Sequence, residues 1–415
     1  MTPVPNKNSI LKIIPACLLT DEPITLHNVP HTSDVQFMGQ ILEDLGGSFQ
    51  RTSDNDVCIT CTGINKHTID RVLSEKMKAS VMFAGPLLVR MGKVAMPTPQ
   101  GCKLWTRPMD VFIDNMVHMW ASYEYKEWIY HIKADKLQGS KIRQEFPSVT
   151  GTENLILMAV MASGTTEIYN AACEPHTQDL CNFLTSMGAQ IQGIGSNKLI
   201  ITGVTKLSWT ERSIISDHLD VAWLITATVM TGGDVTIKNA IIQHMGCLLQ
   251  AFEKLGIILD IDTNKDTIHI GKQDNLTIQK TIKDDDQEFK AWPWPMIPMD
   301  YIPILLVLAM HCHGSAIIHN PYYTTQFFFT QELAKMKGRT IMADPHRVIT
   351  FWPTNRKPAN MLCSDIIQSS YAMLMATLAA PGTSTLNAIT PLFRRFPNFV
   401  QQFNALGAEL TLDED

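Results

Sequence analysis

Cys102 lies in a segment whose composition suits proton transfer by a thiol. The run from Met96 to Thr106, MPTPQGCKLWT, contains two prolines and a glycine and therefore predicts an exposed loop. Lys103 and Arg107 are near enough in the sequence to favour the thiolate. Most cysteines are inert buried groups, so two alternatives stay open, a reactive thiol or a small apolar side chain.

Two further sets of polar residues directly precede apolar stretches of helical length. Lys7 and Asn8 come before ILKIIPACLL, and a cation and an amide at a helix N-terminus suit a phosphate. Asp300 follows PWPMIPM, whose prolines fix the approach to YIPILLVLAMHC and place the carboxylate at that helix's N-terminus. The alternatives are a solvated lysine beside an N-cap asparagine, and an aspartate that only caps its helix.

The elements that must position these residues recur six times along the chain. A turn followed by an alternating strand begins near residues 22, 92, 164, 232, 314 and 382, as in DEPITLHNVP, GTTEIYNAAC and GGDVTIKNAI. An amphipathic helix follows each strand and ends in a glycine signal such as LGG or MGA, which the second unit replaces with Met119 to Ala121. An apolar helix precedes each strand, and helices that are apolar nearly all round are buried.

The length of 415 residues exceeds that of a single core, so we expect an α/β protein with two lobes of three repeats each. We place the boundary in SWTERSIISD, near Ser216. The first lobe then spans residues 9–216 and includes the Cys102 loop. The second spans 217–415 together with residues 1–8.

Composition excludes several classes of function. The formal charge of -6 gives no general attraction to nucleic acid or to an anionic membrane, so we expect neither as a partner. The first residues lack a signal peptide's apolar core and no apolar run is long enough to span a bilayer, which predicts a cytoplasmic protein. The nine cysteines show no disulfide framework, and Cys58 and Cys61 lie in an alternating run that would point them to opposite faces of a strand. We therefore expect reduced thiols and no metal there.

Six helix-and-strand units in two lobes resemble the enolpyruvyl transferase superfamily, whose fold is a two-lobed inside-out α/β barrel. The NSGT-type and GDxSSA-type segments of its shikimate-phosphate branch are absent. NKNSILKIIPACLLTDEPITLHNVP, GCKLWTRPMD and PSVTGTENLILMAVMASGTTEIYNAACEP instead resemble the branch that acts on UDP-N-acetylglucosamine. The resemblance covers nearly the whole chain.

This resemblance implies transfer of the enolpyruvyl group of phosphoenolpyruvate to the 3-hydroxyl of UDP-N-acetylglucosamine, the first committed step of peptidoglycan synthesis. It implies that Cys102 protonates C3 of phosphoenolpyruvate, that Asp300 accepts the hydroxyl proton, and that Lys7 and Arg394 contact phosphoenolpyruvate. It implies no metal and no organic cofactor, and the sequence gives no oligomeric state.

The resemblance also implies a larger set of substrate contacts. The implied substrate-binding residues are Lys7, Asn8, Lys78, Arg107, Pro108, Met109, Asp110, Val111, Ser148, Val149, Asp300, Tyr322 and Asp365. The chain departs from the family pattern at several positions that usually hold a cation or a histidine, namely Lys78 (usually arginine), Phe112, Phe146, His218, Gln326 and Ile367. Because charge-assisted hydrogen bonds are strong, these departures leave an alternative, a catalytically impaired paralogue that binds a UDP-sugar in a regulatory role.

Overall fold

The computed structural model describes residues 1–98, 109–351, 356–394 and 398–413, which form two compact units. Residues 5–98 and 109–215 form the N-terminal unit, and residues 1–4 with the described residues from 216 onward form the C-terminal unit. The predicted lobes assigned residues 1–8 to the second lobe, whereas Pro5 to Asn8 belong to the N-terminal unit. These residues join the N-terminal unit because the first helix already begins at Lys7 and the amide of Asn6 donates to the Ile215 carbonyl at 2.7 Å.

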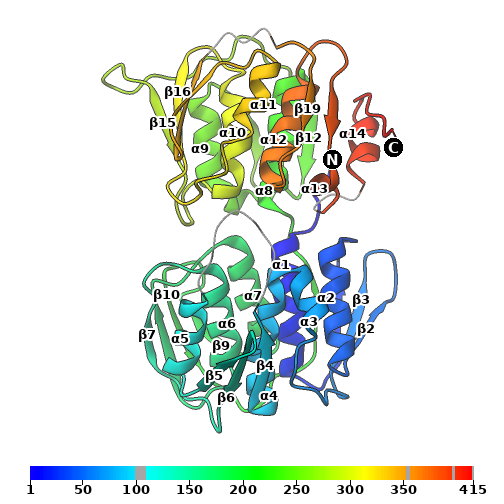
Figure 1. The fold of residues 1–415 in the computed structure, drawn as a ribbon, viewed down its shortest axis with the longest axis vertical. Helices are drawn as coiled ribbons and strands as arrows, with labels where there is room; N and C mark the ends of the chain where they lie inside the picture. Colours follow the sequence, from blue (N-terminus) through cyan, green and yellow to red (C-terminus); the bar gives the residue numbers. More distant parts are fainter. Residues whose placement is uncertain (99–108, 352–355, 395–397, 414–415) are drawn as a thin grey trace. The chain divides into compact units, whose positions relative to one another are not determined.

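Three buried helices form the centre of the N-terminal unit (Figure 1). They are α1 (Lys7–Ala16), α4 (Ala84–Met91) and α6 (Val149–Ala159). Eight of the ten α1 residues, from Ser9 onward, are buried. Burial of nearly every face explains why these helices lack the polar stripe of a surface helix.

The sheets of the N-terminal unit follow one pattern, in which the repeat strand pairs in antiparallel fashion with the later strand of its own repeat. The first sheet has the order β11-β1-β3-β2, the second β4-β6-β5 and the third β7-β8-β10-β9. The strands of this unit are β1 (Ile24–His27), β2 (Ser48–Arg51), β3 (Val57–Thr60), β4 (Lys93–Pro97), β5 (Ser122–Lys126), β6 (Ile129–Lys133), β7 (Lys141–Arg143), β8 (Thr165–Tyr169), β9 (Gln190–Gln192), β10 (Lys198–Thr202) and β11 (Thr210–Ser213). The remaining helices of this unit are η1 (Cys17–Leu19), α2 (Ser33–Asp44), α3 (Arg71–Lys76), η2 (Lys78–Phe83), α5 (Asp110–His118) and α7 (Pro175–Ser186).

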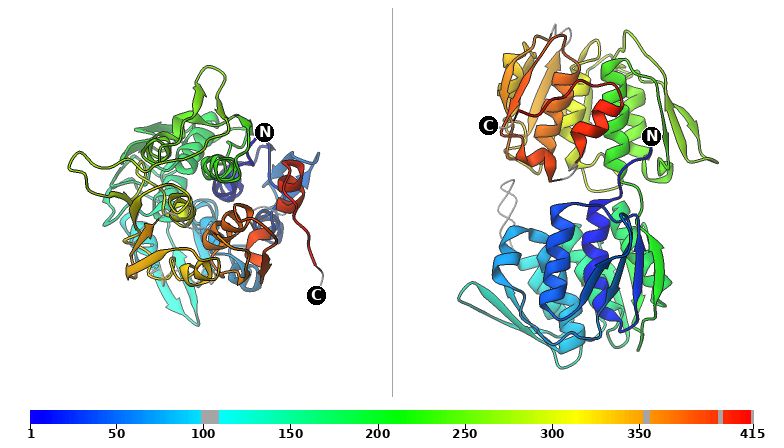
Figure 2. Two further views of the ribbon diagram at one scale, coloured as in Figure 1. Left: turned by 90° about the horizontal axis from the view of Figure 1, so that it is seen from above. Right: turned by 90° about the vertical axis from the view of Figure 1, so that its right-hand side faces the viewer.

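The C-terminal unit is built in the same way around α8 (His218–Thr231), α10 (Ile302–Ala309) and α12 (Ile367–Leu378), which pack against one another (Figure 2). Its sheets have the orders β12-β14-β13, β15-β16-β18-β17 and β19-β20. The strands are β12 (Val235–Lys238), β13 (Asp260–Asp262), β14 (Thr267–Ile270), β15 (Gln287–Lys290), β16 (Ser315–His319), β17 (Thr340–Asp344), β18 (Arg347–Phe351), β19 (Asn360–Leu362) and β20 (Thr385–Asn387). The other helices are η3 (Ile242–His244), α9 (Gly246–Lys254), η4 (Met299–Tyr301), α11 (Thr330–Lys335), α13 (Thr390–Phe393) and α14 (Phe399–Ala405).

The first residues of the chain belong to the edge of the β12 sheet. The Met1 amino group donates to the Thr236 carbonyl at 2.6 Å, and the Lys238 amide donates to the Met1 carbonyl at 2.8 Å. The amide of Val4 donates to Asp220 Oδ2 at 2.7 Å. Residues 1–4 are therefore fixed to strands and helices that lie more than 200 positions later in the sequence.

The six repeat strands and the helices on either side of them recur where the sequence pattern predicts. Asn28, Asn170 and Asn239 each follow a repeat strand with a positive φ of 53 to 58°. Asparagine tolerates this left-handed conformation better than most residues, which explains the repeated asparagine in HNVP, YNAA and KNAI. In the part of the chain that the structure describes, no helix is both long enough and apolar enough to cross a membrane.

Candidate active site

Lys7 is the first residue of α1 and forms an ion pair at the positive end of that helix. Its Nζ lies 2.7 Å from Oδ2 of Asp34 in α2, and the two side chains are 13% and 6% exposed. The side chain of Asn6 caps the helix by accepting from the Ser9 amide at 3.1 Å. Asn8 follows in the first turn, so the predicted phosphate-contacting residues lie where helix amides favour an anion.

The predicted nucleotide-contacting residues also lie at helix starts. Ser148 is the N-cap of α6 and accepts a hydrogen bond at 3.2 Å from an amide of the first turn, and Val149 is the first residue of that helix. Asp110 and Val111 begin α5, and Met109 is its N-cap. This cap role of Ser148 occupies one lone pair of its hydroxyl oxygen.

The elements that carry these residues are in mutual contact. Lys78 is the first residue of η2, which packs against α1 and α6, and α6 also packs against α5. Residues from four separate segments are thereby held on one packed group of helices. Cys102, Arg107 and Pro108 lie outside the described residues, so their predicted roles stay predictions.

Glu174 is a candidate functional residue that the sequence prediction missed. It is the N-cap residue of α7, and its Oε2 is buried. Burial, together with the nearby charge of Glu153, raises the pKa of Glu174 to about 7. A carboxyl that titrates near neutral pH suits proton transfer. The available signal was the Glu-Pro pair at the start of a helix, which by itself indicates only a helix boundary.

In the C-terminal unit, Asp300 lies in η4, directly before α10, with Pro303 in the first turn of that helix. The neighbouring Tyr301 is fully buried, and its hydroxyl lies 2.6 Å from that of Thr226 in α8. The aspartate is half-buried. The predicted position at the start of an apolar helix is what the structure shows, and the buried tyrosine anchors the turn that carries the carboxylate.

Gln326, where the family pattern has an arginine, is buried and holds the same turn. Its Nε2 donates to the Met299 carbonyl at 3.0 Å, and its Oε1 accepts from the Asn320 side chain. The Ser369 hydroxyl donates to the Gln326 carbonyl at 3.0 Å. This glutamine therefore connects η4, the segment after β16 and α12, and it has a structural role in place of a cation.

Of the remaining predicted positions of the C-terminal unit, Tyr322 follows β16 and the others lie near helix ends. The amide of Tyr322 donates to Asn320 Oδ1 at 3.0 Å, and burial raises the pKa of the Tyr322 hydroxyl. Asp365 is exposed just before α12, and Arg394 is the C-cap residue of α13. His218 is the buried first residue of α8, with its ring centroid 5.5 Å from that of Trp294.

The other positions that depart from the family pattern lie in or next to helices. Ile367 begins α12, Phe112 is buried in α5, and Phe146 is 39% exposed ahead of α6. Among the described residues, no group of three or more His, Cys, Asp or Glu side chains is arranged to hold a metal ion.

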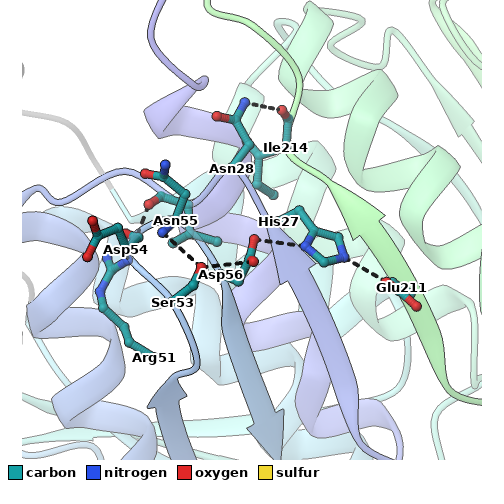
Figure 3. A network of polar contacts seen from close by, with 10 residues as sticks. His27, Asn28, Arg51, Ser53, Asp54, Asn55, Asp56, Glu211 and Ile214 are labelled. Atoms are coloured by element: carbon teal, nitrogen blue, oxygen red, sulfur yellow. Dashed lines mark hydrogen bonds and ion pairs between the residues drawn. The ribbon is translucent and has the colours of Figure 1, made fainter.

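A separate polar network lies at the end of β1 (Figure 3). His27 Nδ1 is 2.8 Å from Asp56 Oδ1, and its Nε2 is 2.8 Å from Glu211 Oε1. Hydrogen bonds to Glu211 and Asp56 raise the pKa of His27, and the imidazole in turn lowers the pKa of Asp56. The ring links the β2–β3 turn to β11, the strand that leads to Ile215 and the C-terminal unit.

Comparison with known proteins places these observations in a family. The family model of EPSP synthase (3-phosphoshikimate 1-carboxyvinyltransferase) matches residues 2–403. The UDP-N-acetylglucosamine 1-carboxyvinyltransferase of Borreliella burgdorferi is 35% identical over 405 residues, covering 98% of this chain and 94% of the relative. That of Bacteroides thetaiotaomicron is 34% identical over 413 residues, covering 98% and 95%. The chain belongs to the UDP-N-acetylglucosamine 1-carboxyvinyltransferase family.

Solved structures support the fold of this family member. The enolpyruvyl transferase NikO from Streptomyces tendae superposes with a TM-score of 0.86 at 19% identity, covering 99% of this chain and 94% of that one. EPSP synthase from Acinetobacter baumannii gives a TM-score of 0.76 at 16% identity, with coverage of 100% and 97%. The predicted family and the six-repeat α/β fold are confirmed.

Proposed function

We propose that this enolpyruvyl transferase joins phosphoenolpyruvate to the 3-hydroxyl of UDP-N-acetylglucosamine and releases phosphate, as the first committed step of peptidoglycan synthesis. The observation that carries the proposal is the common placement of the predicted residues. Lys7, Asp110, Ser148 and Asp300 come from distant parts of the sequence, and each lies at the start of a helix that packs against other buried helices of its unit.

The proposed reaction begins with deprotonation of the sugar hydroxyl. Asp300 accepts the proton of the sugar's 3-hydroxyl while the hydroxyl oxygen attacks C2 of phosphoenolpyruvate. Cys102 delivers a proton to C3. The tetrahedral adduct then loses phosphate from C2 and a proton from C3, which forms the enolpyruvyl ether. The other groups bind and balance charge, with Lys7, Asn8 and Arg394 assigned to phosphoenolpyruvate.

The assignment of the sugar nucleotide follows the same placement. Arg107 suits the diphosphate because a guanidinium can bind two phosphate oxygens at once. Pro108, Met109, Asp110, Val111, Ser148 and Val149 are assigned to the nucleotide, and Lys78, Tyr322 and Asp365 complete the proposed binding set. The half-buried position of Asp300 in a turn anchored by Tyr301 supports its role as the base.

Phosphate release from the two substrates tests the proposal directly. We expect phosphate to form only when phosphoenolpyruvate and UDP-N-acetylglucosamine are both present, in equal amount to the enolpyruvyl product. Binding of UDP-N-acetylglucosamine without phosphate release, at high protein concentration, would instead support the paralogue with a regulatory role.

A further inference from the structure

A buried polar network lies inside the N-terminal unit, beneath the starts of α1, α6 and α7. It connects side chains from these three helices and one strand. Its members are Ser9, Lys12, Glu153, His176, Thr177, Asp179 and Arg212. None of them is among the residues predicted to touch substrate.

The centre of this network is an ion pair between Lys12 in α1 and Glu153 in α6. Lys12 Nζ is 2.9 Å from Glu153 Oε2, and the two residues are 5% and 0% exposed. The other carboxylate oxygen accepts from the Thr177 hydroxyl at 3.2 Å and lies 3.7 Å from His176 Nε2. Burial raises the pKa of Glu153, and Lys12 opposes this shift.

Stability alone gives no reason for this pair. Removing two charges from water costs free energy that their attraction only partly offsets, and apolar side chains of similar volume often stabilise such a site as well or better. Buried ion pairs are best attested as devices that fix one register between packed elements.

Three members of the network lie at a similar depth below the helix starts. Lys12 is six residues after the N-cap Asn6, and Glu153 and Asp179 are each five residues after the N-caps Ser148 and Glu174. At 1.5 Å of rise per residue, this depth is about 7.5 to 9 Å. Each helix start thus stands about one and a half turns above a polar contact to a neighbouring helix.

The same network reaches the predicted phosphoenolpyruvate-binding turn directly. Lys12 Nζ donates to the Asn8 carbonyl at 3.4 Å, so the ammonium joins that turn to Glu153. One turn above Lys12, the Ser9 hydroxyl donates to Asp179 Oδ2 in α7, and Arg212 Nη2 holds the other oxygen of that carboxylate at 3.1 Å.

We infer that Lys12 and Glu153 are positioning residues, which set the register of α1 against α6 and thereby place Lys7 and Asn8 relative to Ser148. This inference rests on the proposed function. The pair touches no substrate and acts through the Asn8 carbonyl and the α6 backbone. A shift of one helix by a fraction of a turn would move the Lys7 ammonium away from the phosphate, and small misplacements of this kind reduce rates strongly.

The decisive variant is Lys12→Met/Glu153→Met, which keeps apolar volume and removes both charges together. We expect the melting temperature to stay within a few degrees of the wild type, the KM for phosphoenolpyruvate to rise at least tenfold, and kcat to fall. Lys12→Arg, which keeps a cation opposite Glu153, should restore the KM to within about threefold of the wild type. The single change Glu153→Gln reports the effect of leaving the lysine unpaired.

Arg90→Met is the matched control. Arg90 lies in the last turn of α4 in the same unit, where its guanidinium donates to the Leu18 carbonyl at 2.9 Å and to the Cys61 carbonyl at 2.7 Å. Its loss should lower the melting temperature and leave the KM for phosphoenolpyruvate unchanged. A double variant that folds normally and keeps wild-type KM and kcat would overturn the positioning role. If the wild type itself released no phosphate, the proposed function would fail, and calorimetric affinities of the same variants for phosphoenolpyruvate would still decide the positioning role.

Discussion

The ammonium of Lys7 lies 2.7 Å from the carboxylate of Asp34, a pair formed between the first turns of α1 and α2. The lysine predicted to bind phosphoenolpyruvate therefore has a structural partner in the protein itself. A substitution at Lys7 would remove the proposed substrate contact and also the lysine partner of a buried carboxylate.

The two effects can be separated with a double variant. Lys7→Met should lower the melting temperature and reduce kcat/KM for phosphoenolpyruvate at least 100-fold. Lys7→Met/Asp34→Asn should recover most of the melting temperature, because the buried charge is gone, while kcat/KM stays low. Recovery of activity together with stability would show that Lys7 has only a structural role. Thermal denaturation and steady-state phosphate release measure the two quantities.

Cys102 is expected to be the thiol that reacts with an epoxide mimic of phosphoenolpyruvate, and faster when UDP-N-acetylglucosamine is present. Cys102→Ala should lose both labelling and turnover, whereas Cys102→Asp should keep some turnover without the label. Burial raises the pKa of Cys181 to about 12 and that of Cys247 to about 11, which disfavours their thiolates. Mass spectrometry of the labelled protein locates the adduct, and full phosphate release by Cys102→Ala would assign the proton to another group.

Gln326 should affect turnover through the turn that carries Asp300. Gln326→Leu removes the hydrogen bond to the Met299 carbonyl, which then keeps only the bond from the Ile302 amide, and this loss costs about 0.5 to 1.5 kcal/mol of stability. We expect kcat to fall about tenfold or more in this variant, with affinity for UDP-N-acetylglucosamine nearly unchanged. Asp300→Asn should fold normally and lose kcat by a larger factor. Equal kcat in Gln326→Leu and the wild type would exclude an influence on Asp300.

The raised pKa of Glu174 predicts a loss of stability with rising pH. The folded protein holds this proton up to about pH 7, whereas an ordinary glutamate loses it near 4.5. Stability therefore falls as pH rises between these values, by about 1 to 3 kcal/mol. Glu174→Gln should remove this slope in urea unfolding at pH 5 and pH 8.5. Glu167 is the control, because hydrogen bonds from Tyr169, Lys141 and Lys198 lower its pKa to about 2, and its contribution should be lost only in acid.

The His27 network predicts a loss of stability in the same direction, with rising pH, for a surface contact. The pKa of His27 is raised in the folded protein, so its contribution is complete below its ordinary pKa and is lost as pH rises through the folded value. The pKa of Asp56 is lowered, so its contribution appears above its ordinary range. The difference in melting temperature between the wild type and His27→Gln should therefore be largest near pH 5.5 and smaller at pH 8.5.

Much of the fold could be predicted because the same sequence pattern repeats along the chain. Turns, alternating strands and apolar helices recur at nearly constant intervals, and each is a local signal. The possible N-cap at Asn8 was wrong, because the helix begins two residues earlier and its N-cap is Asn6. The boundary at Ser216 lies next to the observed change of unit, but Pro5 to Asn8 were misplaced, since their unit depends on a hydrogen bond to Ile215.

Contacts between side chains of different helices and loops could not be predicted in this way. Lys7 and Asp34 are 27 positions apart, and Glu153 and Lys12 belong to different repeats, so no spacing rule joins them. The family pattern has an arginine at position 326, so the sequence alone indicated only a missing positive charge at Gln326. The structure shows a buried amide with hydrogen bonds to Asn320 and Met299. Such contacts depend on how the helices pack, which a pattern along one chain does not specify.

The pairing of Met1 with β12 has a consequence for the order in which the protein is made. Residues 5–215 leave the ribosome as a nearly complete folding unit, and N-terminal units generally fold first during synthesis. The first four residues leave even earlier, but their partners at Thr236, Lys238 and Asp220 are synthesised more than 200 residues later. Residues 1–4 therefore reach their native contacts only after the C-terminal unit emerges, so the N-terminal unit can fold on the ribosome before the β12 sheet acquires this edge.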